Sequence, residues 1–126
     1  MDVVAIGDSL AVGVGQSMQI ETHAKVGASS CWIYHHLPSD SYDTAIISAG
    51  VNDGDSKHCI TEIRKSVKAK RVIWILPAAY ATDEVYAVAK KWGDTVVSYT
   101  TGKGKTWPHP PQYDYRPLAH SIQEKL

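Results

Sequence analysis

The chain has 126 residues, a length typical of one domain with a single hydrophobic core. Thirteen basic residues balance thirteen acidic ones, which excludes the positive surplus typical of nucleic-acid binding and of anionic-membrane anchors. The longest apolar run, residues 72–81, is about half of a membrane span, and no signal-peptide pattern precedes the first predicted strand, so we expect one cytoplasmic domain over residues 1–126.

Short apolar segments predict five strands, separated by segments of helical pattern. The strand candidates are residues 3–6, 24–26, 44–49, 71–76 and 95–99. Most of the first, third and fourth segments are continuous runs rich in Val and Ile, which is typical of strands buried on both faces. These strands are therefore expected in the interior of a sheet.

Helical stripes lie between and after these strands. They cover residues 10–20, 60–67, 85–92 and 118–126. The first is the weakest, because its glycines lower helix propensity. Asp55 or Ser56 is the expected N-cap of the second helix and Thr82 that of the third, which should end at Gly93. Pro117 suits the first turn of the last helix.

Strands that alternate with helices predict right-handed crossovers and a mostly parallel sheet covered on both sides. The expected fold is a three-layer α/β/α sandwich with a five-stranded sheet in flavodoxin-like order. In such sheets a functional site lies at the carboxyl ends of the strands. This rule selects the loops at residues 7–10, 27–31, 50–55, 77–82 and 100–113.

Two of these loops carry a candidate nucleophile and a candidate base. Ser9 follows the first strand, where its hydroxyl would stand above the sheet and its own N–H would lie at a helix N-terminus. The alternative is that Ser9 or Asp8 is simply an N-cap. His109 lies between two prolines, which could hold its imidazole as a general base toward Ser9. The alternative is an exposed loop histidine.

Two other loops carry candidate donors to an oxyanion. Gly27 could bring a backbone N–H close to a ligand, although a glycine after a strand also serves a turn. Asn52 could donate from its side-chain amide, and its alternative role is an Asx-turn. All four loops lie at one end of the predicted sheet. Together they supply the groups that acyl transfer requires.

At these positions the chain resembles the SGNH (GDSL) hydrolases. Ala5-Ile6-Gly7-Asp8-Ser9-Leu10 is similar to block I, and Lys25-Val26-Gly27-Ala28-Ser29 is similar to block II. Gly50-Val51-Asn52-Asp53 matches the GxND pattern of block III, and His109-Pro110 resembles the His-Pro of block V. The blocks occur in the family's order and extend from residue 5 to about residue 122.

The resemblance implies an SGNH hydrolase fold and a serine esterase without a cofactor. Ser9 would form the acyl-enzyme and His109 would act as the base. The Ser9 N–H, the Gly27 N–H and the Asn52 amide would form the oxyanion hole. The chain has little material for a lid, so we expect an open cleft, a short acyl group such as acetyl, and a small-molecule or glycan ester as substrate. The small size resembles that of phage-encoded members.

The chain departs from the family at the residue that orients the histidine. The family reads Asp-x-x-His, whereas here Thr106 stands three residues before His109. A backbone carbonyl, which we favour, or the Thr106 hydroxyl could accept from the ring, and Asp114 is a further candidate. Trp107 is expected in the substrate cleft. The missing carboxylate also keeps open a non-catalytic carbohydrate- or ester-binding module on the same fold.

The cysteines and the remaining histidines do not form a recognisable metal motif. Cys31 and Cys59 lack CxxC spacing, so we interpret them as reduced thiols, with a disulfide as the alternative. The neighbouring His35 and His36 would point in different directions on a helix, and no HxxxH or HExxH pattern occurs. They are interpreted as surface residues, together with His23, His58 and Asp40, and no metal is expected.

Overall fold

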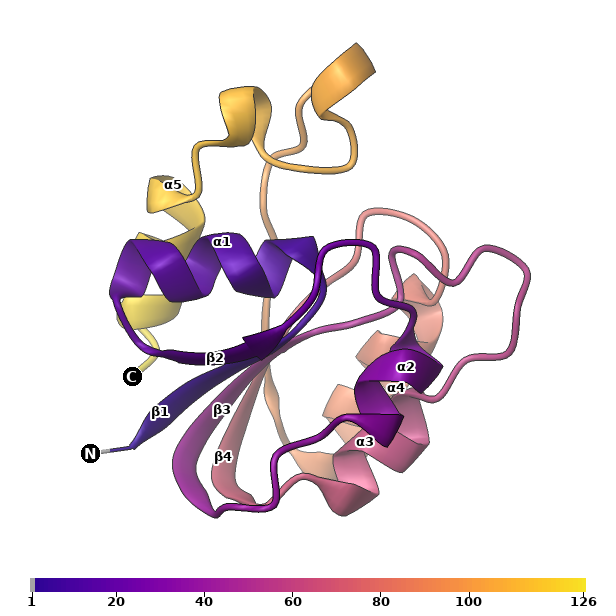
Figure 1. Cartoon of the computed structure of the whole chain (residues 1–126), viewed down its shortest axis with the longest axis vertical. Coiled ribbons are helices and arrows are strands. Elements are labelled where there is room, and N and C mark those ends of the chain that lie inside the picture. The colour runs from indigo at the N-terminus through magenta and orange to yellow at the C-terminus, as the bar shows by residue number, and fades with distance from the viewer. Residues whose placement is uncertain (1) are drawn as a thin grey trace.

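The computed structural model describes residues 2–126 and shows an α/β fold with a five-stranded, all-parallel sheet (Figure 1). The strands are β1 (Val3–Gly7), β2 (Glu21–Ala24), β3 (Tyr42–Ser48), β4 (Ala69–Ile75) and β5 (Thr95–Val97). Their order across the sheet is β2-β1-β3-β4-β5, which is the flavodoxin-like order that the sequence predicts.

Helices cover both faces of the sheet. They are α1 (Ser9–Met18), α2 (Ser30–His35), α3 (Ile60–Ser66), α4 (Thr82–Trp92) and α5 (Arg116–Gln123), with 3-10 turns at Gly104–Thr106 and Pro111–Tyr113. Helices α1 and α5 pack together, while α2 packs on α3 and α3 on α4 (Figure 1). The three-layer sandwich is confirmed. No helix within residues 2–126 is long and apolar enough to cross a bilayer.

The alternation of side chains along the central strands separates two hydrophobic cores. Ala45 and Ile47 of β3 belong to the core under α2, α3 and α4. Ile46, which lies between them, belongs to the core under α1 and α5. Because successive strand residues point to opposite faces, a strand covered on both sides must be apolar throughout. This explains the continuous Val- and Ile-rich runs in the sequence.

The strands end together at one edge of the sheet. Gly7 of β1 is level with both Ala24 of β2 and Ser48 of β3, and Ser48 is level with Ile75 of β4. A Cβ on Gly7, whose φ is +144°, would lie 1.9 Å from the Ser48 carbonyl oxygen. Only glycine therefore fits where β1 turns into α1 against the end of β3.

The second strand lies earlier than the sequence predicts. It covers Glu21–Ala24 instead of residues 24–26, because the pairing with β1 ends at Ala24 and Val26 is 69% exposed. As an edge strand, β2 exposes most of its side chains, so its polar sequence gives no buried-strand pattern. Helix α2 is not predicted from the sequence either. It begins where the Ser29 hydroxyl accepts a hydrogen bond from the Trp32 N–H at 3.2 Å.

Two of the predicted helix caps are wrong. Cys59, and neither Asp55 nor Ser56, precedes α3. Thr82 is the first residue of α4, and its hydroxyl donates to the Pro77 carbonyl at 2.9 Å instead of capping the helix. The later helix signals are confirmed. Gly93 ends α4 in a left-handed conformation, and Pro117 lies in the first turn of α5.

The interpretation of two reduced thiols is also wrong, because Cys31 and Cys59 form a disulfide. Their Cα atoms are 4.8 Å apart although the residues are separated by 28 positions. The bond joins the first turn of α2 to the residue before α3. Packing of these two helices brings the cysteines together, and no local spacing rule could reveal it. The cytoplasmic location stays a prediction.

Candidate active site

The side chains of Ser9 and His109 meet at the carboxyl edge of the sheet. Ser9 Oγ and His109 Nε2 are 2.8 Å apart, within hydrogen-bond distance, although 100 residues separate them in the chain. Ser9 is the first residue of α1, so its N–H is one of the groups that a helix leaves without an internal partner. A hydroxyl, an imidazole and a helix N-terminus are therefore combined at one point.

Asp8, and not Ser9, caps the first helix. Its fully buried carboxylate accepts a hydrogen bond from the Leu10 N–H at 3.1 Å. Burial raises the pKa of Asp8 to about 7, because desolvation disfavours the charged form more than the nearby N–H groups favour it. Because Asp8 fills the capping role, the Ser9 hydroxyl is available to His109.

The loop that carries His109 is held by its backbone and by a tyrosine. The Gly102 N–H donates to the His109 carbonyl at 2.7 Å, and the Tyr99 hydroxyl donates to the Pro108 carbonyl at 2.6 Å. The ring of Tyr113 packs at a tilt against the imidazole, with 5.1 Å between ring centres. These contacts, together with the flanking prolines, fix the ring toward Ser9.

None of the expected partners orients the second ring nitrogen of His109. Its Nδ1 is buried and has no hydrogen-bond partner within residues 2–126, which excludes the backbone carbonyl that the sequence favoured. The Thr106 hydroxyl instead donates to the Lys103 carbonyl at 3.2 Å. Asp114 binds Arg116 through both carboxylate oxygens, which holds the pKa of that carboxyl at about 2.

Gly27 and Asn52 lie on two loops that are tied to each other. The Asn52 amide donates to the Ala28 carbonyl at 3.0 Å, which leaves its second N–H for another acceptor. Gly27 is exposed with a φ of +81°, so the turn requires a glycine and its surroundings are open. The Lys25 N–H in turn donates to the Gly7 carbonyl at 3.0 Å. Both candidate donors are thus connected to the end of β1.

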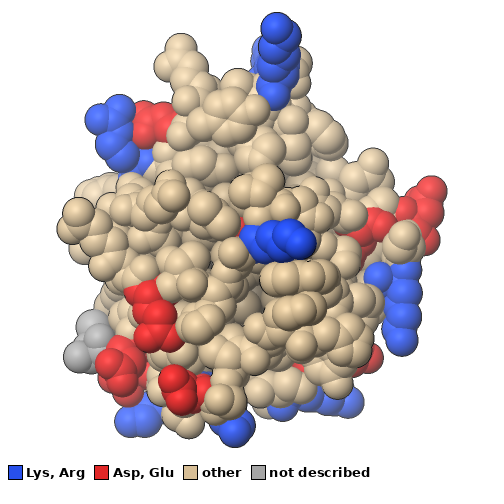
Figure 2. All heavy atoms as spheres, viewed as in Figure 1, with Lys and Arg blue, Asp and Glu red and all other residues tan. Residues whose placement is uncertain are grey.

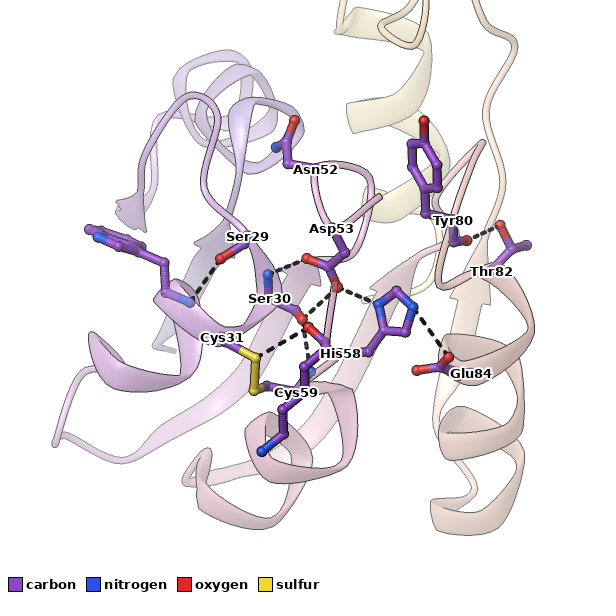
Figure 3. Close-up of polar contacts among 12 residues, drawn as sticks. Ser29, Ser30, Cys31, Asn52, Asp53, His58, Cys59, Tyr80, Thr82 and Glu84 are labelled. Carbon is purple, nitrogen blue, oxygen red and sulfur yellow. Dashed lines mark hydrogen bonds and ion pairs between the residues drawn. A yellow bond between two sulfur atoms is a disulfide. The ribbon is translucent and has the colours of Figure 1, made fainter. Parts of the chain in front are cut away.

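A buried polar network that the sequence does not predict lies next to Asn52 (Figure 3). The buried carboxylate of Asp53 accepts from the Ser30 N–H at 2.7 Å, from the Ser30 hydroxyl at 2.6 Å and from His58 Nδ1 at 2.7 Å. His58 Nε2 lies 3.4 Å from a carboxylate oxygen of Glu84 on α4. The hydrogen bond to Asp53 is the main reason that the pKa of His58 is raised. The GxND match singles out Asp53, and Ser30 carries no sequence signal. The interpretation of His58 as a surface residue is wrong, because its ring is half-buried and bound to Asp53.

Trp107 lies on the His109 loop and is 48% exposed. It stands two residues before His109 in the chain, and a role in contacting substrate stays a prediction.

Comparison with known proteins supports the fold. No family model matches the chain, and a search of the curated proteins gives no match. Among solved structures, a protein from Desulfitobacterium hafniense DCB-2, described as a "putative lipolytic protein of G-D-S-L family", is similar with a TM-score of 0.62. The similarity covers 99% of each chain at 15% sequence identity. This chain therefore has the same α/β fold as that GDSL-family neighbour.

Proposed function

We propose that the protein is a serine esterase that hydrolyses short-chain, acetyl-like carboxylic esters. The observation that carries the proposal is the 2.8 Å approach of Ser9 Oγ to His109 Nε2 at the N-terminus of α1. The fold shared with a GDSL-family protein supports a hydrolase of this class.

In the proposed mechanism, His109 Nε2 takes the proton of the Ser9 hydroxyl while Oγ forms a bond to the ester carbonyl carbon. The Ser9 N–H, the Gly27 N–H and the free N–H of the Asn52 amide stabilise the negative charge on the carbonyl oxygen. His109 then gives its proton to the leaving alcohol as the ester C–O bond breaks. His109 takes a proton from a water molecule as the water oxygen attacks the acyl carbon, and it gives that proton to Ser9 Oγ as the acyl C–Oγ bond breaks, which releases the acid.

The environment of His109 makes this a dyad. For Nε2 to accept the Ser9 proton, the neutral ring must carry its hydrogen on Nδ1. Since Nδ1 has no acceptor in the described chain, this tautomer and the imidazolium lack the support that an aspartate provides. We therefore expect slower turnover than a complete triad achieves, on a small-molecule or glycan ester with an activated or short acyl group.

The proposal is tested with 4-nitrophenyl acetate and four variants. Ser9→Ala and His109→Ala are each expected to abolish turnover, because the two residues act as one unit. Ser17→Ala, on the same helix, and His120→Ala, on α5, are matched controls that should keep wild-type activity. Both control residues are exposed. A fluorophosphonate adduct that mass spectrometry maps to Ser9 would identify the nucleophile directly.

The second candidate function is a non-catalytic binding module for carbohydrates or esters. One observation favours it, because His109 Nδ1 has no hydrogen-bond partner within residues 2–126. Absence of turnover and of the fluorophosphonate adduct in folded wild-type protein, with retained binding of an ester, would support the module. Equal activity of the wild type and a folded Ser9→Ala variant would reject the proposed nucleophile.

A further inference from the structure

An open hollow lies beside the loop that carries Gly27. Its volume is about 360 Å³, and it is lined by Lys25, Val26, Gly27, Ala28, Ser29 and Trp32. The backbone of Lys25 is bound to Gly7, two residues before Ser9 in the chain. A ligand group in this hollow would therefore lie next to one of the proposed oxyanion donors and close to the end of β1.

One wall of the hollow is a fixed aromatic ring. The imidazole of His36 stacks on the indole of Trp32, with ring centres 3.8 Å apart and planes only 12° from parallel. His36 Nδ1 donates to the Trp32 carbonyl at 2.7 Å, and the Ser29 hydroxyl holds the Trp32 N–H. One face of the indole is thus covered by His36.

Lys25 makes a cation–π contact with this ring. Its Nζ lies 5.2 Å from the centre of the Trp32 ring. Within residues 2–126, no carboxylate lies within ion-pair distance of this ammonium. On the face of the molecule nearest the viewer, which includes α2, one Lys or Arg side chain lies near the centre among uncharged residues, and most other charged side chains lie toward the rim (Figure 2).

From this arrangement we infer that the hollow is a specificity subsite for an ester that carries a carboxylate, with Lys25 binding the carboxylate and the Trp32 ring positioning the Lys25 ammonium through their cation–π contact. The inference rests on the proposed esterase function and names its substrate class. An ammonium without a carboxylate partner, placed beside a rigid aromatic face, favours an anion, because it offers charge together with a surface that needs no further ordering. Gly27, a proposed oxyanion donor, is one of the residues that line the hollow.

The test compares matched anionic and neutral esters. On the acyl side, 4-nitrophenyl hemisuccinate is compared with 4-nitrophenyl butyrate, and on the alcohol side, 4-acetoxybenzoate with 4-acetoxybenzamide. The wild type should prefer the anionic member of at least one pair. Lys25→Gln should lower this preference, measured as the ratio of kcat/KM values, by about three- to fivefold at low salt, the order of one exposed ion pair. Lys25→Arg should largely restore the ratio, and added salt should lower it in the wild type.

Lys65→Gln, an exposed lysine on α3, is the matched control and should leave both ratios unchanged. Ratios that are the same in wild type and Lys25→Gln for both pairs would overturn the inference while leaving the esterase proposal intact. Absence of turnover on every ester would instead reject the esterase. A readout without turnover is the Trp32 indole N–H resonance in Ser9→Ala, which should shift with 4-hydroxybenzoate and not with 4-hydroxybenzamide. An equal response to both compounds would also overturn the inference.

Discussion

The carboxylate of Asp53 accepts hydrogen bonds from both the backbone N–H and the hydroxyl of Ser30, 23 residues away. Ser30 lies on α2, directly after the loop that carries Gly27, and Asp53 follows Asn52. The pair therefore holds together the two loops that bear the proposed oxyanion donors, in addition to the hydrogen bond from Asn52 to Ala28. Asp53 is a positioning residue in this arrangement.

Asp53→Asn is expected to lower the free energy of unfolding by about 2–3 kcal/mol, because an amide offers one acceptor oxygen where three donors converge and its NH₂ is left buried. Urea denaturation measures this loss, and Asp55→Asn, on the exposed part of the same loop, should stay within about 0.5 kcal/mol of wild type. In the folded variant kcat should fall more than KM changes. Unchanged kcat would show that Asp53 is structural only.

His58 makes the stability of this region depend on pH. Its folded pKa is raised above the ordinary value of 6.5, first by the hydrogen bond to Asp53, with Glu84 adding a smaller favourable charge. The stabilisation is therefore fully present below the unfolded pKa and is lost as pH rises through the raised folded pKa. The difference in unfolding free energy between wild type and His58→Gln should be largest near pH 5 and shrink as the pH rises through the raised folded pKa. A constant difference would contradict this ionisation.

The disulfide is expected to stabilise the same two helices. Closing a chain segment of 28 residues is worth about 3–4 kcal/mol in the chain-entropy description. Reduction of the wild type, or replacement of both cysteines by serine, should lower the free energy of unfolding by up to this amount. Mass analysis with a thiol reagent checks that the bond is present. Two freely reactive thiols in the native, unreduced protein would contradict the bond.

The sequence predicts most of the fold because strands that are buried on both faces of the sheet are recognisable as continuous apolar runs. Residues of β1, β3 and β4 are apolar at consecutive positions, and this pattern needs no knowledge of the partners. Strand β2 has no continuous apolar run, since its side chains are mostly exposed at the edge of the sheet. Helix α2 was missed because it spans only the six residues Ser30–His35.

The candidate site likewise contains residues that the sequence predicts and others that it does not predict. Ser9, Gly27, Asn52 and His109 could be singled out because each follows a predicted strand or precedes a predicted helix, so topology alone brings their loops to one edge. Partners fixed by tertiary packing could not be predicted. The Cys31–Cys59 bond and the contacts of Ser30 and His58 with Asp53 join segments whose approach depends on how the helices pack.

Asn52 is expected to act mainly in the transition state. One of its amide hydrogens is bound to Ala28, and the other is proposed to reach the oxyanion. Asn52→Ala should therefore lower kcat by roughly 10²–10³ with little change in KM. Gln16→Ala, which removes an exposed amide from α1, is the control and should keep wild-type kcat. An effect on KM alone would mean that Asn52 binds the substrate in its ground state.

The last prediction concerns the second ring nitrogen of His109. The Thr106 hydroxyl is bound to Lys103 and Asp114 is bound to Arg116, so neither supports the imidazole. Thr106→Ala and Asp114→Asn should both keep kcat within about twofold of wild type. A marked loss in either variant would make that side chain the missing partner.

Thr106→Asp should, in contrast, raise kcat. The His109 N–H donates to the Thr106 carbonyl at 2.6 Å, so both side chains leave the same tight turn. A carboxylate at position 106 would be repelled by the Lys103 carbonyl that the hydroxyl now binds, and His109 Nδ1, which has no partner in the described chain, offers it a donor. One hydrogen bond to a charged partner corresponds to roughly ten- to hundredfold in rate. Thr106→Asn is the matched control, because an amide of the same shape cannot neutralise an imidazolium and should give no comparable gain. Equal kcat values for the Asp and Asn variants would show that the turn does not direct a side chain at position 106 toward the ring.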